Sequence, residues 1–198
     1  VVRLGKPTTR KMRYIEPGYF RKLFEVYDFD DSPLDTQNEN TFQQMIVERA
    51  AKYDLVVVTD FGHGLISDAS IELLNTEARF LAANAQTNSA NVGFNLITKY
   101  RGADYICIDA PETRLAVGDN FNDIQSIIVN SLVNLTACKK VIVTHGKHGC
   151  VTFETGGSTL TIPAFTKTVI DTVGAGDAFL AVTSPLAAAG GDITDIGF

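Results

Sequence analysis

Short apolar runs bounded by polar residues recur along most of the chain. Asp54–Asp60, Tyr105–Ile108 and Lys140–Thr144 each place branched or otherwise apolar residues side by side. A continuous apolar run of this length is typical of a parallel strand that is buried on both faces. These segments therefore predict the strands of a mainly parallel sheet.

Segments with helical spacing alternate with these strands. Apolar residues recur every three or four positions between Phe42 and Ala50, and Ser67 can cap a helix over Asp68–Ala82. Strands that alternate with helices predict a layered α/β domain. Three more helices are expected, over Thr113–Val117, over Asp123–Cys138, and over Asp177–Ala189, where Pro185 should kink the helix or end it early.

The first thirty residues follow a different pattern. Arg13–Ile15 and Leu23–Tyr27 alternate in side-chain character on either side of a Pro17-Gly18 turn. We expect a β-ribbon over residues 1–30, an acidic loop at Asp28–Asp35, and the α/β core over residues 41–198. A further hairpin is predicted between Cys150–Glu154 and Thr159–Ile162.

Composition excludes several classes of protein. The 198 residues carry a net charge of −6, which does not favour binding to nucleic acid or to an anionic membrane. The uncharged stretch Phe80–Thr98 contains amide side chains that are costly in hydrocarbon, so no membrane span is expected. Cys107, Cys138 and Cys150 lack metal-binding spacing, and we interpret them as buried thiols of a cytoplasmic protein.

Three unusual loops follow the predicted strands. They are Thr59–Gly64, Asp109–Glu112 and Thr144–Gly149. Ligands of open parallel sheets bind at the carboxyl ends of the strands, so these loops are expected to form the functional site. His145 and His148 lie in the third loop without a third ligand nearby in the sequence, and we interpret them as polar loop residues.

The strongest chemical signal is the segment Asp171–Phe179, which reads DTVGAGDAF. Gly174 and Gly176 precede a predicted helix, where the backbone can approach a ligand and the N–H groups can face an anion. Asp177 would then lie close to that anion. This repulsive arrangement makes sense if Asp177 accepts the proton of a hydroxyl that attacks a phosphate.

Simpler interpretations of the same pattern exist. Gly174-Ala175-Gly176 is also compatible with a tight strand–helix turn that binds nothing, with Asp177 as a helix-start carboxylate. A dinucleotide-binding fingerprint would need a third glycine where Phe179 stands, and a phosphate loop would need a Gly-Lys-Ser/Thr that does not follow. The short pattern alone leaves the turn and the phosphate site open.

Asp171–Asp177 resembles the second signature of the ribokinase-like, or PfkB, family of carbohydrate kinases, D-T-x-G-A-G-D, at every fixed position. The resemblance implies a three-layer ribokinase-like fold with the ribbon as a lid, and transfer of the γ-phosphate of ATP to a sugar hydroxyl. Asp177 would be the base, and the backbone of Gly174, Ala175 and Gly176 would be the anion hole. Thr172 would contact the nucleotide, and Asp171 would help to hold a monovalent cation.

Two further segments are similar to motifs of this family. Thr144–Gly149 looks like its T-x-G-x-x-G nucleotide loop, which implies that Thr144, Gly146 and Gly149 lie against ATP. Asp109–Glu112 stands where the family has N-x-x-E. The resemblance implies that Glu112, with Asp109 beside it, organises the water shell of Mg²⁺.

A narrower resemblance is to the heptose 7-phosphate kinases. Lys6–Arg13 looks like their P-T-T-x-K-x-R strand, Thr59–Gly64 like their D-Y-G-K-G loop, and Tyr100–Ala103 matches their Y-R-G-A. By this analogy Lys11 and Arg13 contact the sugar phosphate, and Asp60 lies near the acceptor. Another acceptor, such as a fructose phosphate or a nucleoside, is the alternative substrate.

Four positions depart from these patterns. Asp109 replaces an Asn, His63 replaces a Lys, and Asn84 and Gln86 replace the Asp and Lys of a V-D-P-K strand end. The altered charges motivate a second hypothesis, a degenerate kinase domain that binds nucleotide or sugar as a regulatory or assembly module. The intact Asp171–Asp177 motif favours an active enzyme, because a binding module has little use for a base.

Two expectations concern the assembly and the extent of the chain. The ribbon is rich in aromatic residues, so we expect a homodimer formed through it; the residues are Tyr14, Tyr19, Phe20, Phe24 and Tyr27. Members of this family begin with a Gly-rich first signature, which this sequence does not contain. They also continue with further helices beyond the position that corresponds to Phe198. We therefore expect this sequence to be the middle and C-terminal part of a longer kinase.

Overall fold

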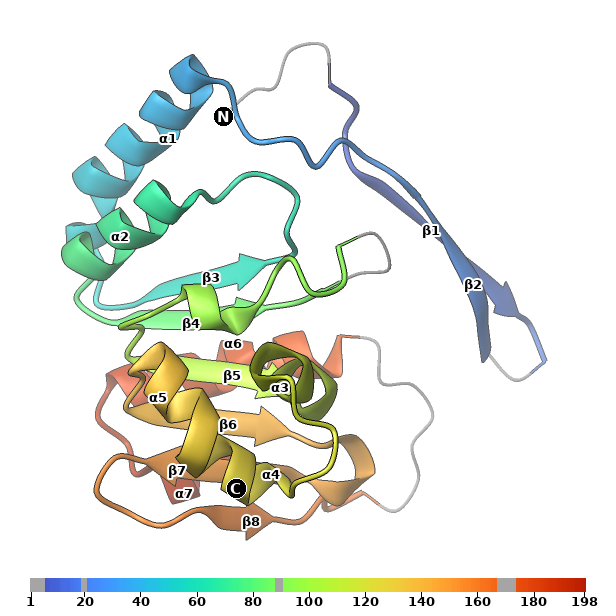
Figure 1. Cartoon of the computed structure of the whole chain (residues 1–198), viewed down its shortest axis with the longest axis vertical. Coiled ribbons are helices and arrows are strands. Elements are labelled where there is room, and N and C mark those ends of the chain that lie inside the picture. Colours follow the sequence, from blue (N-terminus) through green and yellow to red (C-terminus); the bar gives the residue numbers. More distant parts are fainter. Residues whose placement is uncertain (1–5, 19–20, 88–90, 167–173) are drawn as a thin grey trace.

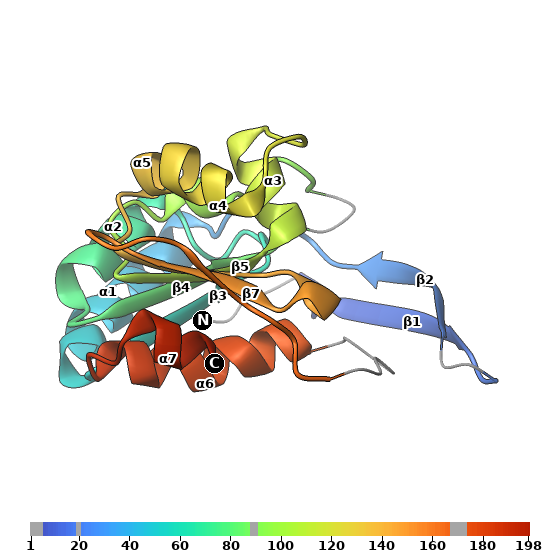
Figure 2. The same ribbon diagram turned by 90° about the horizontal axis from the view of Figure 1, so that it is seen from below.

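A two-stranded ribbon projects from an α/β core in the computed structural model, which describes residues 6–18, 21–87, 91–166 and 174–198 (Figures 1 and 2). Strands β1 (Arg10–Glu16) and β2 (Arg21–Asp28) pair antiparallel, with a register shift between Tyr14 and Ile15. The predicted N-terminal ribbon is confirmed.

The core contains one six-stranded sheet in the order β3-β4-β5-β6-β7-β8. Strands β3 to β6 are parallel, and β7 and β8 continue the sheet as the predicted antiparallel hairpin. The strands are β3 (Val56–Asp60), β4 (Leu81–Ala85), β5 (Tyr105–Asp109), β6 (Lys140–Thr144), β7 (Cys150–Glu154) and β8 (Leu160–Ile162).

Helices connect these strands on both faces of the sheet. A single helical segment over residues 124–136 contains a π-helical stretch in its middle. None of the described helices combines the length and the apolar character that crossing a bilayer requires. The helices are α1 (Thr36–Arg49), α2 (Asp68–Glu77), α3 (Ala110–Val117), α4 (Ile124–Ile127), α5 (Val133–Thr136), α6 (Ala175–Ala188) and α7 (Ile193–Gly197), with 3-10 turns at Ala50–Lys52, Ile97–Lys99 and Gly146–His148.

Alternate residues of the central strands bury their side chains on opposite faces. In β5, Ile106 and Ile108 pack into a core shared with α1, α2 and the 124–136 segment, whereas Tyr105 and Cys107 pack against α6 and α7. Burial on both faces explains why β5 and β6 have continuous apolar runs rather than alternating ones. The expected burial on both faces is wrong for β3, which lies at the edge of the sheet and exposes Val57 and Thr59. The predicted three-layer fold with a mainly parallel sheet is confirmed.

One predicted boundary is wrong. The helix expected over Asp68–Ala82 ends at Glu77, and Leu81–Ala85 forms the fully buried strand β4. Leu and Ala are good helix formers, so the local propensity of Leu81 and Ala82 favours a longer helix than the one that forms. Pairing with β3 on one side and β5 on the other overrides that propensity. Of the two outcomes expected at Pro185, an early end of the helix does not occur, since α6 continues to Ala188, and a kink stays a prediction.

Candidate active site

The loops after the parallel strands lie at one edge of the sheet, as their common direction requires (Figure 1). The register pairs Asp109 at the end of β5 with Thr144 at the end of β6. Helix α6 begins at the same edge with Gly174 in the left-handed conformation, φ +78°. Two cavities meet at this edge.

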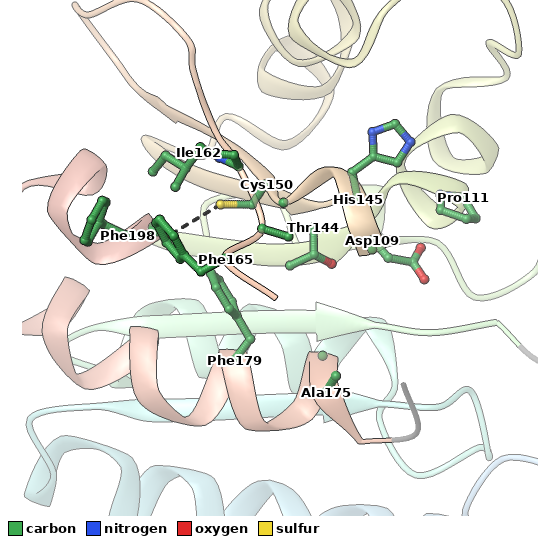
Figure 3. Close-up of a pocket in the computed structure, with 16 residues that line it drawn as sticks. Asp109, Pro111, Thr144, His145, Cys150, Ile162, Phe165, Ala175, Phe179 and Phe198 are labelled. Carbon is green, nitrogen blue, oxygen red and sulfur yellow. Dashed lines mark hydrogen bonds between the residues drawn. The ribbon is translucent and has the colours of Figure 1, made fainter. Parts of the chain in front are cut away.

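The first cavity has a volume of about 610 Å³ and a polar and an apolar end (Figure 3). Asp109 and Thr144 line the polar end beside Ala175 at the start of α6, and Gly146 also lines the cavity. Aromatic and sulfur-containing side chains line the other end, namely Cys150, Phe165, Phe179 and Phe198. An apolar slot that leads to backbone N–H groups can hold a flat ring system joined to an anionic chain.

The loop at this cavity depends on glycine at one position. Gly149 has φ +87°, and a Cβ there would lie 1.9 Å from the carbonyl oxygen of Ile162. Its own carbonyl accepts a hydrogen bond from the His145 N–H at 2.7 Å, which closes the loop. The three predicted nucleotide-loop residues, Thr144, Gly146 and Gly149, therefore lie on one side of the same cavity.

The second cavity, of about 830 Å³, lies between the ribbon and the sheet edge. Lys11 and Arg13 line it from β1, and Asp60 lines it from the end of β3. Glu112 and Asp177 complete the polar lining from the core. The structure thus brings together residues that are up to 166 positions apart in the sequence, from the ribbon and from α6.

A single carboxylate organises the ribbon side of this cavity. Glu25 accepts hydrogen bonds from Arg13 Nε at 2.9 Å and from the Tyr27 hydroxyl at 2.8 Å, and it also pairs with Lys11 and Lys22. Partial burial alone would raise the pKa of Glu25, but these hydrogen bonds outweigh it and lower the pKa to about 2. Glu25 therefore stays ionised and holds the two cations that face the cavity.

Asp60 is held inside the core rather than turned freely toward the cavity. Only 6% of it is exposed, and its carboxylate accepts hydrogen bonds from the Tyr100 hydroxyl at 2.7 Å and the Gly62 N–H at 2.8 Å. Lys99 forms an ion pair with the same carboxylate. Burial and the neighbouring Asp60 charge raise the pKa of Tyr100 far above its ordinary value, so the phenol remains a donor.

The two cavities share Asp109 and Gly176 in their linings, so they lie side by side at the first turn of α6. Asp177 is exposed on the second-cavity side of this junction. Its Oδ1 accepts a hydrogen bond from Gln86 Nε2 at 3.3 Å. A carboxylate in this position can exchange a proton with a group held in the second cavity.

Glu112 lies beside this junction. Its Oε1 accepts hydrogen bonds from the backbone N–H of Thr87 at 2.8 Å and from the Thr87 hydroxyl at 2.9 Å. Burial raises the pKa of Glu112, the bonds from Thr87 oppose this, and the charge of Asp109 adds to the rise. Asp109 caps α3 by accepting a 2.7 Å hydrogen bond from the Glu112 N–H.

A small cavity of about 50 Å³ lies beside Asp109 and Glu112, and its lining shows whether Mg²⁺ would fit at this place. Asn84, Asp109, Glu112 and Thr144 line it, and the buried Oδ1 of Asn84 has no hydrogen-bond partner. Mg²⁺ prefers oxygen ligands and keeps several waters, and an orphaned oxygen beside two carboxylates suits such a hydrated ion. Within the described ranges no three His, Cys, Asp or Glu side chains form a group that could hold a metal directly.

Two predicted site residues lie outside the described residues, Asp171 and Thr172. Sequence analysis did not identify Thr87 or Glu25 as site residues. It identified Gln86 only as a position where the lysine of a family motif is replaced by an uncharged residue. Glu25 faces Arg13 in the ribbon register, so knowledge of that register would have revealed it. Phe165, Phe179 and Phe198 come from separate segments, and no local sequence signal connects them.

Comparison with known proteins places these features in a family. The model of the pfkB family carbohydrate kinases matches residues 34–197. A bifunctional protein HldE of Bradyrhizobium diazoefficiens is 26% identical over 190 residues, which cover 95% of this chain and 38% of that protein. The HldE of Rhodopseudomonas palustris is also 26% identical, over 192 residues and with the same coverage. The chain thus spans less than half the length of these relatives.

Solved structures share the fold at low sequence identity. The ribokinase of Arabidopsis thaliana, solved with ribose and ATP, has a TM-score of 0.66 at 13% identity over 98% of this chain and 60% of its own. Phosphofructokinase-2 of Escherichia coli, solved with potassium, has a TM-score of 0.68 at 11% identity over 88% of this chain and 57% of its own. These likenesses show the ribokinase-like fold of the chain.

Proposed function

The chain belongs to the pfkB family of carbohydrate kinases, and from this premise we propose that it transfers the γ-phosphate of ATP to a hydroxyl of a sugar or sugar phosphate. One observation carries the proposal. Asp177 and the start of α6 lie at the junction of a cavity suited to a nucleotide and a cavity lined by cations. A donor phosphate and an acceptor hydroxyl would meet at this point.

The first cavity is the proposed nucleotide site. The aromatic end would take the base, and the Thr144–Gly149 loop with the start of α6 would face the phosphates. The solved Arabidopsis thaliana ribokinase, described with ATP, shares the fold and supports this assignment. The predicted contact of Thr172 with the nucleotide remains part of the proposal.

Asp177 would accept the proton of the acceptor hydroxyl as its oxygen forms a bond to the γ-phosphorus. The bond between the γ-phosphorus and the β–γ bridging oxygen would break at the same time, with ADP as the leaving group. The backbone N–H groups at Gly174, Ala175 and Gly176 would face the charge that develops on the transferred phosphoryl oxygens. Such donors stabilise a transition state because they are already oriented before the reaction. The proton then lies on the Asp177 carboxyl until product leaves.

The second cavity is the proposed acceptor site. Lys11 and Arg13 are oriented by Glu25 on the cavity-facing side of the ribbon, where they can bind a phosphate group carried by the acceptor. With the resemblance of Lys6–Arg13 and Thr59–Gly64 to heptose kinases, this favours a heptose 7-phosphate. Asp60 would act by holding the Phe61–Gly64 loop, since its carboxylate is bonded within the core.

Two cations belong to the proposal. Mg²⁺ supplies charge neutralisation on the ATP phosphates when bound, and Glu112, Asp109 and Asn84 would hold its water shell. Asp171 would help to hold a monovalent cation. The relative solved with potassium, phosphofructokinase-2, supports testing K⁺ in the assay.

The decisive experiment measures ADP release by the full-length protein with Mg²⁺ and ATP over a panel of sugars and sugar 7-phosphates. Asp177→Asn is expected to lower kcat by about 10³-fold or more while ATP binding is kept, since it removes the base and retains the shape of the side chain. Near-normal turnover of Asp177→Asn would remove this residue as the base.

The second hypothesis is an outcome of the same experiment. ATP bound with no ADP released from any acceptor would favour a degenerate kinase that works as a binding module. If ADP is released with a fructose phosphate or a nucleoside but not with a heptose 7-phosphate, the proposed kinase activity is supported and the proposed acceptor is wrong.

A homodimer through the ribbon is also proposed. The ribbon turns Lys11 and Arg13 toward the cavity, and its other face carries the stacked pair Tyr14 and Phe24, with ring centroids 4.4 Å apart and about half of each side chain exposed. An apolar outer face on a polar lid suits pairing with a second copy. Sedimentation that stays monomeric across a concentration series would contradict this proposal, and Phe24→Lys is expected to weaken a dimer that forms.

A further inference from the structure

We propose that Gln86 is a positioning residue for Asp177, and this inference rests on the proposed kinase function. Its side-chain amide holds one oxygen of the Asp177 carboxylate so that the other oxygen faces the acceptor hydroxyl. The replacement of a lysine at this strand end would then be a functional feature of the site rather than a loss.

The contact links two distant parts of the chain at the cavity junction. Gln86 follows β4 directly, and its Nε2 donates to Asp177 Oδ1 at 3.3 Å across 91 sequence positions. Both residues line the second cavity. Since Oδ1 is the oxygen that Gln86 binds, Oδ2 is the one left to receive a proton.

The backbone of Gln86 is fixed on both sides. Its N–H donates to the carbonyl of Asp60 at 2.8 Å, and its carbonyl accepts a hydrogen bond from Asn95 Nδ2 at 2.9 Å. The same Asn95 amide donates to the Asp60 carbonyl at 2.9 Å, and only 3% of Asn95 is exposed. A side chain that starts from such an anchored backbone loses less freedom when it binds Asp177.

The chemistry suits an uncharged donor. An amide can orient a carboxylate without the strong electrostatic attraction with which an ammonium would lower the pKa of the acid and weaken it as a base. Other charged or titratable groups already line the same cavity, namely Lys11, Arg13, Asp60, His63, Asp109 and Glu112. Because Gln86 is neutral, it can orient the Asp177 carboxylate without adding another charge to this cavity.

The test compares Gln86→Leu, Gln86→Lys and Gln86→Glu in the full-length protein. Gln44→Leu is the matched control, because Gln44 also donates its amide to a carboxylate, Glu48, but on the exposed surface of α1. Two readouts are needed: the pH profile of kcat, and the pKa of Asp177 from the ¹³C shift of its carboxyl carbon, assigned by its loss in Asp177→Asn. Thermal melting confirms that each variant is folded.

We expect Gln86→Leu to lower kcat by about 10-fold, with the KM for ATP unchanged, because the carboxylate loses its orienting bond. The pKa of Asp177 should rise in Gln86→Leu and rise further in Gln86→Glu, and it should fall in Gln86→Lys. The acid limb of the kcat profile should move in the same directions. Gln44→Leu should match the unaltered protein in every readout.

The two proposals fail in different ways. If the pKa of Asp177 in all three Gln86 variants equals its pKa in the unaltered protein, the positioning role is wrong, whatever the activity. An unaltered protein that releases no ADP with any acceptor overturns the proposed function, while the carboxyl titration still decides whether Gln86 acts on Asp177. A fall in kcat with no change in that pKa would also count against the inference, since it would indicate a general structural defect.

Discussion

The two walls of the second cavity, the proposed acceptor site, are built by different physical means. On the ribbon wall, Lys11, Arg13 and Lys22 gather around Glu25 on two strands that project from the core. On the sheet wall, the Asp60 carboxylate is bonded to Tyr100 and Lys99 beneath a buried strand end. One wall is held by ion pairs of exposed cations, and the other by a buried carboxylate that combines hydrogen bonds with one partly exposed cation.

This difference sets what each wall can tolerate. Ion pairs near solvent contribute roughly 0–1 kcal/mol each and weaken in salt. Breaking a buried charged contact costs about 3–5 kcal/mol, because the remaining partner loses both its solvent and its counter-charge. The sheet wall should therefore be rigid and intolerant of change, while the ribbon wall can adjust to an incoming ligand.

The largest expected effect lies at the Thr144–Gly149 loop, which is proposed to bind the nucleotide. Gly149→Ala should lower the free energy of unfolding by about 3 kcal/mol or more, since its φ is +87° and the new Cβ would meet the Ile162 carbonyl oxygen at 1.9 Å. Gly146→Ala is the control, because φ there is +52° and nothing lies within 4 Å of the new Cβ. Urea titration of both variants measures this, and equal losses would contradict the steric explanation.

A smaller effect is expected at Asp60. Asp60→Asn should lower the free energy of unfolding by about 2 kcal/mol, less than a fully buried pair would lose, because a quarter of the Lys99 side chain is exposed. Tyr100→Phe removes only the hydroxyl and should cost about 1 kcal/mol. If Asp60→Asn proved as stable as the unaltered protein in urea, the contrast between the walls would be lost.

On the ribbon, function should change with little change in stability. Arg13→Ala is expected to raise the KM for a phosphorylated acceptor by about 10- to 100-fold and to lower the free energy of unfolding by less than about 1 kcal/mol. Arg10→Ala provides the comparison, since Arg10 lies on the same strand and pairs with Asp28. Steady-state kinetics at two salt concentrations would show the effect, and an equal rise in KM for both variants would contradict a specific phosphate contact.

The smallest expected effect is an acid response confined to the ribbon. The pKa of Glu25 is lowered to about 2 from an ordinary value of 4.5, so its ion pairs favour the folded ribbon above pH 4.5. That stabilisation should decline as the pH falls from 4.5 toward 2 and protonates the carboxylate. Amide NMR signals of Met12 and Val26, which pair across the ribbon, should shift in this range and stay constant in Glu25→Gln.

Much of the fold could be predicted because its cause is local. Strands buried on both faces carry continuous apolar runs, so Tyr105–Asp109 and Lys140–Thr144 were recognisable. Val56–Asp60 was recognised as a strand by the same kind of run, but it lies at the edge of the sheet and exposes Val57 and Thr59.

The apolar pattern did not identify Leu81–Ala85, because its alanines suit a helix equally well and pairing with two neighbouring strands makes it a strand. The same contacts bury Asn84, an amide that seldom marks a strand interior. Only the resemblance to a V-D-P-K motif indicated a strand end at Asn84 and Gln86.

The candidate site divides in a similar way. Asp171–Asp177 and Thr144–Gly149 could be proposed as phosphate-binding segments from the sequence, because their glycines and carboxylates lie within one loop or one helix turn. Glu25 and Gln86 gave no such signal, since each acquires a role only from a partner elsewhere, Arg13 and Asp177 respectively. A role that depends on a partner cannot be read from the residue alone.

Residue order by itself determined the strand–helix alternation, the family and the identity of the proposed base, because these depend on periodicity and on short motifs. Tertiary structure alone decided that two cavities meet at Asp109 and Gly176, that Asp60 is turned into the core, and that Gln86 reaches Asp177. The physical reason is that hydrogen bonds and desolvation act over a few ångströms of space. Sequence separation does not limit them once the sheet has brought its strand ends to one edge.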